Sequence, residues 1–230
     1  IPSKAYLHLS HIIHDAKEAK NSGVNFNNPT IDINKICNWK DSIVNNLNLG
    51  IETLAQQRKI KIVNGLASFL SANKISVRDT QKKKVTIEFD YCIIATGSSP
   101  AKLKDINTNY SNVINSTQAL SLKKIPKKML VIGGGYIGLE LGTAYESFGS
   151  KITVAEFLPN LLSMADKDLV NPLFKILKNK FENIFLSTEV INVEEKDKTI
   201  SVTFKNGNKL FQDSFDVVLV SIGRRPNDIV

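Results

Sequence analysis

One stretch decides the fold of this chain: Leu130-Val131-Ile132-Gly133-Gly134-Gly135-Tyr136-Ile137-Gly138-Leu139-Glu140. Its apolar beginning, together with Met129, predicts a buried strand of a parallel sheet. A helical pattern follows as far as Phe148 and is ended by Gly149. A second strand pattern covers residues 151–155 and leads into Glu156. This order of strand, glycine-rich turn, helix and strand predicts a βαβ unit.

The three glycines of the Gly-x-Gly-x-x-Gly pattern each meet a separate requirement. Gly133 permits a tight turn, Gly135 lets the backbone approach a pyrophosphate, and Gly138 lets the helix pack close to the strand. The helix N-terminus offers free N–H groups and the positive end of its dipole to phosphates. The stretch therefore predicts a dinucleotide-binding site. The alternative is a glycine-rich turn that binds nothing, which the surrounding strands and helix make less plausible.

Glu156 indicates which dinucleotide the site would take. It lies 18 positions after Gly138, where a carboxylate can accept hydrogen bonds from both ribose hydroxyls. A carboxylate there would repel a 2′-phosphate, and the next basic residue is Lys167. The sequence therefore favours NAD over NADP.

Composition and charge set broader limits. The chain has 230 residues, 42% of them hydrophobic, and a net charge of +8 from 30 basic and 22 acidic side chains. The tightest basic cluster, residues 82–84, lies in a predicted hairpin turn, so we expect a solvated turn. A basic nucleic-acid-binding protein is an alternative that depends on charge alone. No apolar run of about 20 residues exists, so no membrane span is expected.

The cysteines and histidines give no strong metal signal. Cys37 and Cys92 form no C-x-x-C pair and no zinc spacing, which fits reduced, cytosolic conditions. Cys92 falls in an apolar pattern that predicts a core position, and the state of Cys37 is open. The spacing of His8, His11 and His14 allows a metal site on a helix, but a polar helix face is the preferred interpretation because no i, i+4 pair is present.

The first half of the chain predicts helices and then strands. We expect a helix over residues 1–20, started by Pro2 and Ser3 and ended by Gly23. A second helix is expected over 35–58, with Trp39 in the core and a possible bend at Gly50. The expected strands are 60–63, a meander of 67–70, 74–77 and 84–89, and a buried strand at 91–95.

The second half predicts a crossing segment over residues 98–127 and then the βαβ unit. Asp166 is expected to cap a helix that runs to Lys180. Asn206-Gly207 is a strong hairpin-turn signal. Strands are expected near Phe185 and over 190–194, 201–204, 209–211 and 215–220.

An internal repeat links the two halves. Residues 89–100 and 215–226 both contain Phe-Asp, four apolar residues, a small residue, one more, and then Gly-x-x-Pro. The repeat predicts two related nucleotide-binding halves. The glycine fingerprint lies 90 positions before Gly223, but the same distance before Gly97 falls at Leu7. We therefore expect the opening unit of the first half to lie upstream of Ile1.

With these two halves, the chain resembles the flavin-dependent pyridine nucleotide–disulfide oxidoreductases. Residues 1–5, Ile-Pro-Ser-Lys-Ala, resemble the segment directly after the second redox cysteine of that family. Trp39-Lys40, Val63-Asn64-Gly65 and residues 133–142 resemble the dihydrolipoamide dehydrogenases in particular. The glutathione and mercuric reductases are weaker matches.

The resemblance implies an α/β fold with two domains. Residues 126–230 would form a Rossmann-like NAD-binding domain with the character of a three-layer ββα sandwich. Residues 1–125 would form part of a related FAD-binding domain without its N-terminal fingerprint.

The resemblance also implies site residues. Lys4 would reach the flavin and form a buried ion pair with Glu140, and these two would be the catalytic residues present. Tyr136 would cover the nicotinamide pocket before NAD enters, although a core aromatic is the alternative. The FAD site would include Lys4, Ala67, Thr96, Gly97 and Ser98. The NAD site would include Gly133, Gly134, Gly135, Tyr136, Ile137, Gly138, Glu140, Glu156, Val190 and Gly223.

The implied activity is a relay in which dihydrolipoamide reduces an enzyme disulfide and electrons pass through FAD to NAD. The implied partners are lipoyl domains of 2-oxoacid dehydrogenase complexes and a second copy of the chain in a homodimer. We expect the protein to act in the cytoplasm. We expect no nucleic acid or membrane as a partner, and no metal site. The redox cysteines are expected before Ile1, and a catalytic His-Glu pair and dimerisation domain after Val230. We therefore expect no lipoamide activity from these 230 residues alone. The alternatives are another FAD/NAD(P) disulfide reductase and a non-catalytic nucleotide-binding module.

Overall fold

The structure, a computed structural model, describes residues 1–104 and 106–228. Contacts divide the chain into two compact units. The first combines residues 1–44 with 100–223, and the second combines 45–99 with the residues from 224 onward. No helix in the described part of the chain has the length and apolar character needed to cross a membrane.

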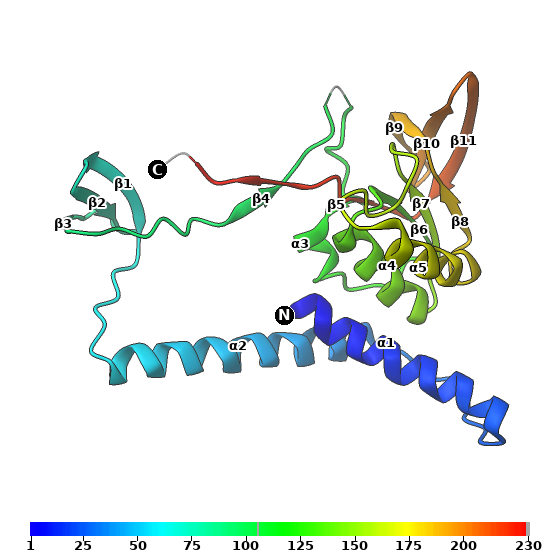
Figure 1. The fold of residues 1–230 in the computed structure, drawn as a ribbon, viewed down its shortest axis with the longest axis horizontal. Coiled ribbons are helices and arrows are strands. Elements are labelled where there is room, and N and C mark those ends of the chain that lie inside the picture. Colours follow the sequence, from blue (N-terminus) through cyan, green and yellow to red (C-terminus); the bar gives the residue numbers. More distant parts are fainter. Residues whose placement is uncertain (105, 229–230) are drawn as a thin grey trace. The chain divides into compact units, whose positions relative to one another are not determined.

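A five-stranded parallel sheet forms the centre of the first unit (Figure 1). Its strand order is β5-β12-β6-β7-β8, and the strands span Val113–Asn115, Val217–Val220, Lys128–Ile132, Lys151–Ala155 and Asn183–Phe185. The strands expected near 129–132, 151–155 and Phe185 are confirmed. The strand expected over 215–220 is confirmed over 217–220, because Phe215 ends the preceding strand. β5 was missed, because its three residues lie within the expected crossing segment.

Both faces of this sheet are buried, which explains why β6 is apolar from Met129 to Ile132. Met129 and Val131 pack with the helices, whereas Leu130 and Ile132 pack with a second sheet. The helices of this cluster are α1 (Pro2–Glu18), the start of α2 (Ile33–Gln57), α3 (Ser116–Ala119), α4 (Tyr136–Ser147) and α5 (Lys167–Lys180). Asp166 is the N-cap residue of α5, but its side chain makes no capping hydrogen bond.

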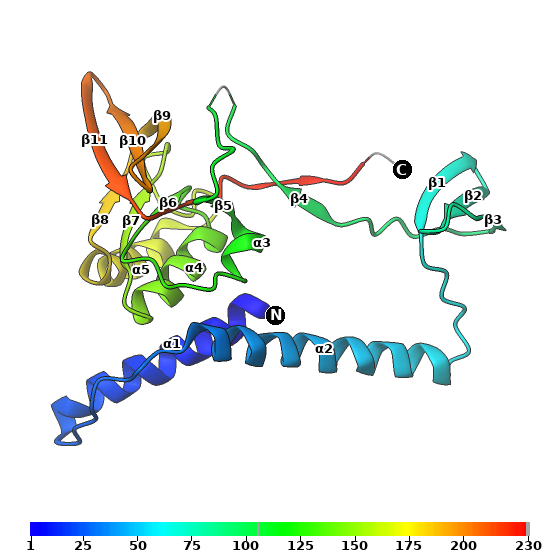
Figure 2. The ribbon, with the colours of Figure 1, turned by 180° about the vertical axis from the view of Figure 1, so that it is seen from behind.

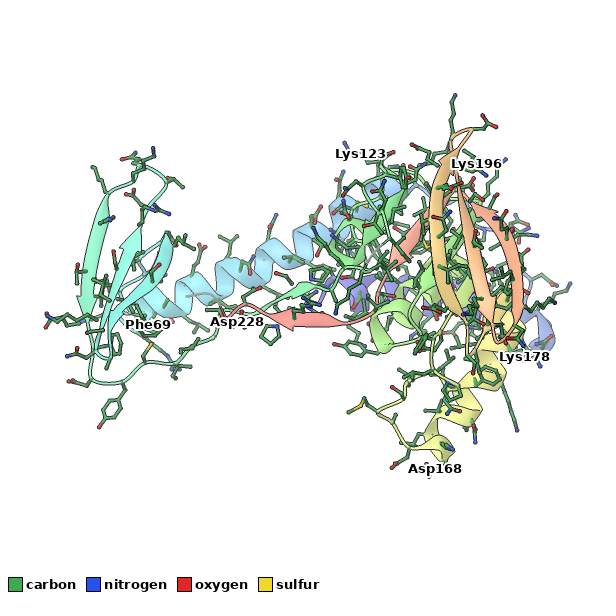
Figure 3. All side chains as sticks on the ribbon, turned by 90° about the horizontal axis from the view of Figure 1, so that it is seen from above. Phe69, Lys123, Asp168, Lys178, Lys196 and Asp228 are labelled. Carbon is green, nitrogen blue, oxygen red and sulfur yellow. The ribbon has the colours of Figure 1, made fainter. Side chains whose placement is uncertain are left out.

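The second layer is an antiparallel sheet of β9 (Glu189–Lys196), β10 (Thr199–Asn206) and β11 (Lys209–Phe215). It lies on the side of the parallel sheet opposite α4 and α5 (Figure 2). Lys196 lies at the tip of the β9–β10 hairpin (Figure 3), and Gly207 closes the predicted β10–β11 turn with φ 57°. The expectation of a three-layer ββα arrangement is confirmed.

The first helix packs against α4. Tyr6 and Tyr145 are fully buried and both contact Phe148 edge to face. Their hydroxyls donate hydrogen bonds to Leu120 O at 2.8 Å and Ala119 O at 2.6 Å. Burial raises the pKa of both phenols well above the ordinary value, so they stay neutral donors. These contacts fix α1 within the first unit.

The ends of α1 follow the sequence only in part. Pro2 occupies the first turn, and Gly23 ends the following 3-10 turn, Ala19–Ser22, with φ 90°. Ser3 was expected as a cap, but its hydroxyl donates to Glu140 Oε2 at 2.9 Å.

The second helix, α2 (Ile33–Gln57), runs through Gly50. Trp39 was expected in the core but is 37% exposed and lies beside His8, with ring centroids 6.3 Å apart.

The second unit contains the expected antiparallel meander of β1 (Leu66–Ser71), β2 (Lys74–Arg78) and β3 (Lys84–Glu88). The strands expected at 60–63 and 91–95 are absent from it. Tyr91 and Ile93 are 95% and 92% exposed, and Cys92 is exposed, so its predicted core position is wrong. The physical reason is that a strand needs a neighbouring strand, and the described residues supply none beside these segments.

The two ends of the internal repeat form a small sheet of β4 (Ser98–Pro100) and β13 (Arg224–Pro226). Next to it, Asn227 N–H donates to Gly97 O at 3.0 Å. The sequence predicts a boundary near residue 126 between an FAD-binding and an NAD-binding domain, and this boundary stays a prediction. The first unit additionally takes α1 and β5 from the residues before 126.

Replacing Gly138 by alanine should destabilise the first unit by about 1–3 kcal/mol through overpacking. An added Cβ would lie 2.5 Å from Ser221 Oγ and 2.6 Å from Gly133 O. The matched control is Gly135→Ser, because no atom lies within 4 Å of that Cβ position and serine is a good N-cap. The measurement is urea unfolding followed by the fluorescence of Trp39, the only tryptophan. Equal losses of stability in the two variants would contradict the packing argument.

Candidate functional site

A cavity of about 1030 Å³ lies at the carboxyl ends of the parallel strands. The chain leaves β6 toward β7 on one side, and β12 lies on the other, so the strand order reverses here. Ligands of open α/β sheets bind at this type of position. The cavity is lined mainly by residues 132–137, 155–158, 162–165, 188–191 and 221–223.

The glycine-rich loop has the geometry that a phosphate-binding turn requires. Gly133 has φ 102°, and a Cβ there would lie 2.6 Å from Ser221 O. Gly138 is equally enclosed, whereas Gly135, the N-cap residue of α4, faces open space. The backbone at Gly135 is therefore accessible from the cavity, beside the first N–H groups of α4.

Glu156 lies at the end of β7 and lines the same cavity. Its carboxylate already accepts two backbone hydrogen bonds, from Gly134 N at 2.5 Å and from Leu158 N at 2.7 Å. Sequence reasoning placed Glu156 at the ribose but missed these contacts. No sequence pattern signals them, because they depend on how the loop after β7 folds back.

Other predicted residues also line the cavity. Tyr136 is 65% exposed, so the core-aromatic alternative is wrong. Ile137, Val190 and Gly223 are lining residues as well, and Gly223 has φ 119°. Sequence reasoning missed the apolar lining residue Met164, which is 99% exposed.

The predicted pair of Lys4 and Glu140 is present within the first unit. Lys4 Nζ lies 2.5 Å from Glu140 Oε1, and the Ser3 hydroxyl donates to Oε2. The pair was expected to be buried, but the Lys4 side chain is 70% exposed and that of Glu140 is 24% exposed. Long side chains from two helix surfaces meet here at the edge of the α1–α4 contact. Glu140 faces α1 and does not line the cavity.

The other residues predicted for a flavin site belong to the second unit. Ala67 lies on β1 opposite Val77. The Thr96 hydroxyl donates to Asn227 O at 2.6 Å, and Ser98 Oγ accepts from Arg224 Nε at 2.7 Å. Gly97 has φ 73°. The predicted flavin residues are thus divided between the two units, and their grouping stays a prediction.

Among the described residues, no group of three His, Cys, Asp or Glu side chains could hold a metal ion. His8, His11 and His14 lie along α1 without such a group. Cys37 is half-buried, and its Sγ lies 3.2 Å from the Tyr6 hydroxyl.

Comparison with known proteins finds relatives along nearly the whole chain. The chain is 42% identical over 228 residues to the dihydrolipoyl dehydrogenase of Vibrio cholerae serotype O1, covering 99% of this chain and 48% of that protein. It is 41% identical over 230 residues to that of Buchnera aphidicola subsp. Schizaphis graminum, again covering 99% and 48%. The chain spans about half the length of the curated relatives it matches.

A solved structure is similar as well. The Cu(II) complex of the HOCl-induced flavoprotein disulfide reductase RclA from Escherichia coli superposes with a TM-score of 0.79 at 25% identity, over 99% of this chain and 47% of that one. The family model described as pyridine nucleotide-disulphide oxidoreductase matches residues 1–230. The chain therefore belongs to the pyridine nucleotide-disulphide oxidoreductase family.

Proposed function

We propose that the protein containing this chain is an FAD- and NAD-dependent dihydrolipoyl dehydrogenase. The observation that carries the proposal is the cavity at the end of β6, where an accessible glycine backbone, the N-terminus of α4 and a carboxylate meet. These are the groups that a pyrophosphate and an adenosine ribose require. FAD and NAD(H) are also the cofactors of the family and of the dihydrolipoyl dehydrogenases it resembles.

The residues of the cavity fit NAD(H). The open space at Gly135 leaves room for a pyrophosphate that a side chain would exclude. Glu156 would accept the adenosine ribose hydroxyls, and its negative charge would disfavour a 2′-phosphate. Tyr136, exposed at the start of α4, would cover the nicotinamide end of the cavity.

Lys4 and Glu140 would act on the flavin side. When bound, FAD supplies a two-electron carrier between thiols and nicotinamide. Lys4 would hold a positive charge beside the isoalloxazine ring, where negative charge develops on reduction. Glu140 would orient the Lys4 ammonium through their short contact, and Ser3 would fix the other carboxylate oxygen. Thr96, Gly97, Ser98 and Ala67 would line the FAD.

The biological setting belongs to the same proposal. We expect the protein to act in the cytoplasm on lipoyl domains of 2-oxoacid dehydrogenase complexes, and to form a homodimer. We expect neither nucleic acid nor a membrane as a partner.

A second candidate is another flavoprotein disulfide reductase, which the similarity to the RclA structure supports. The experiment that separates the two is a steady-state assay of the full-length protein. We expect dihydrolipoamide to reduce NAD much faster than NADP, because Glu156 opposes the 2′-phosphate. Preference for NADP, or faster turnover with glutathione disulfide than with lipoamide, would contradict the proposal.

Gly135→Ser should weaken NAD binding by about tenfold or more, on the order of 1.4 kcal/mol. The reason is that any side chain at this position occupies the open space beside the first N–H groups of α4. The measurement is titration of NADH fluorescence with the full-length variant, after urea unfolding has shown that its stability is retained. Wild-type affinity in a stable variant would contradict the assigned place of the pyrophosphate.

Glu140→Gln should slow flavin reduction by dihydrolipoamide about tenfold, on the order of 1.4 kcal/mol of barrier. The substitution removes the charge-assisted contact that orients Lys4. The matched control is Glu182→Gln, because the Lys151–Glu182 pair has similar exposures, 71% and 29%, and spans 2.9 Å. Stopped-flow absorbance of the flavin provides the rate. If both variants slow reduction equally, the effect is not specific to the Lys4 pair.

A further inference from the structure

The Glu156 carboxylate ties the glycine-rich loop to the end of a strand. Its Oε2 atom accepts from Gly134 N–H at 2.5 Å, and Oε1 accepts from Leu158 N–H at 2.7 Å. The Glu156 backbone is also fixed, since its N–H donates to Phe185 O at 2.8 Å and its C=O accepts from Thr188 N at 2.9 Å. The side chain therefore starts from an immobilised position, and the loop is attached to it.

Gly134 is held from its other side as well. Its carbonyl oxygen accepts a hydrogen bond from Leu162 N–H at 3.0 Å. The Leu161 side chain, only 2% exposed, lies over it, so that an added Cβ would be 2.5 Å from Leu161 Cδ2. Both polar backbone atoms of Gly134 thus have partners in the segment 156–162. Gly134 is consequently held from both sides by the segment that follows β7.

These contacts leave the carboxylate free to accept more hydrogen bonds. An ionised carboxylate has about four acceptor sites, two on each oxygen. Each oxygen of Glu156 uses one site for a backbone amide. One site remains on each oxygen, and the two hydroxyls of a ribose need one each. Glu156 can therefore receive a ribose without releasing the loop.

We propose that Glu156 is a positioning residue for the phosphate loop and holds Gly134 in place before any dinucleotide arrives. The three residues Glu156, Gly134 and Leu158 form a carboxylate latch. The identity of the ligand rests on the proposed function, but the latch is a property of the free protein. A loop that is ordered in advance binds without the entropic cost of ordering.

Hydrogen exchange of the ligand-free, full-length protein tests the latch. In Glu156→Gln the side chain keeps its size, but an NH₂ donor replaces one of the two carboxylate oxygens. The side chain can then no longer accept from the backbone amides of Gly134 and Leu158 through a separate oxygen for each. We expect amide exchange in the segments 133–138 and 156–162 to accelerate about 10- to 100-fold, as loss of a hydrogen bond to a charged group predicts. A residue that only touched the ribose would leave this exchange unchanged, and that result would overturn the proposal.

Two further variants make the result specific. Glu189→Gln removes the same charge from the same cavity, but Glu189 is not part of the latch. Exchange in this variant should match that of the wild type, and equal acceleration would overturn the proposal. Glu156→Asp keeps the charge and shortens the side chain by one methylene. It should accelerate exchange even if Glu156→Gln does not fold, and unchanged exchange in Glu156→Asp would count against the latch.

NAD titration of the wild-type protein separates the two ideas. Absent NAD binding together with accelerated exchange in the variants contradicts the proposed function and supports the latch. Normal NAD binding together with unchanged exchange contradicts the latch and leaves the proposed function intact.

Discussion

The first unit depends on a contact that has no space for a side chain. Where β6 ends, the backbone of Ser221 lies against Gly133, and the Ser221 side chain lies against Gly138. The absence of Cβ atoms at these two glycines lets α4 start directly over the sheet and brings β12 up beside β6. The cavity exists because this junction is compact, so that the loop, the strand ends and the start of α4 share one edge of the sheet.

Sequence predicted the parts of the molecule that local pattern determines. The run from Met129 to Ile132 is apolar because both of its faces are buried. The hydrophobic periodicity and the glycines that end each pattern then predicted α4, β7 and the β10–β11 turn. Glycine spacing and Glu156 located the cavity for the same reason, since the βαβ unit is contiguous in sequence. The pairing of Lys4 with Glu140 came from resemblance alone, because 136 residues separate them.

Predictions that needed distant partners were less successful. The segments 60–63 and 91–95 have the composition of strands, but the described residues offer no strand beside them, and Tyr91 and Ile93 are exposed. β5 is too short for periodicity to reveal. The contacts between Glu156 and Gly134 depend on the fold of a loop, and neither residue type predicts them. Where pairing with distant residues decides whether a strand or a contact forms, the local sequence pattern is insufficient to predict it.

The packing of α1 on α4 bears on how such a protein could be recombined. Ser3 and Lys4 donate hydrogen bonds to the Glu140 carboxylate. Seven residues further along both helices, the hydroxyl oxygens of Ser10 and Ser147 lie 2.5 Å apart. A half that began at residue 126 would lose these polar contacts between α1 and α4 together with β5. Exchange of the predicted dinucleotide-binding half between relatives would therefore have to include α1, or change the residues on the face of α4 that α1 covers. The compact unit that would have to be exchanged is therefore discontinuous in sequence although it is contiguous in space.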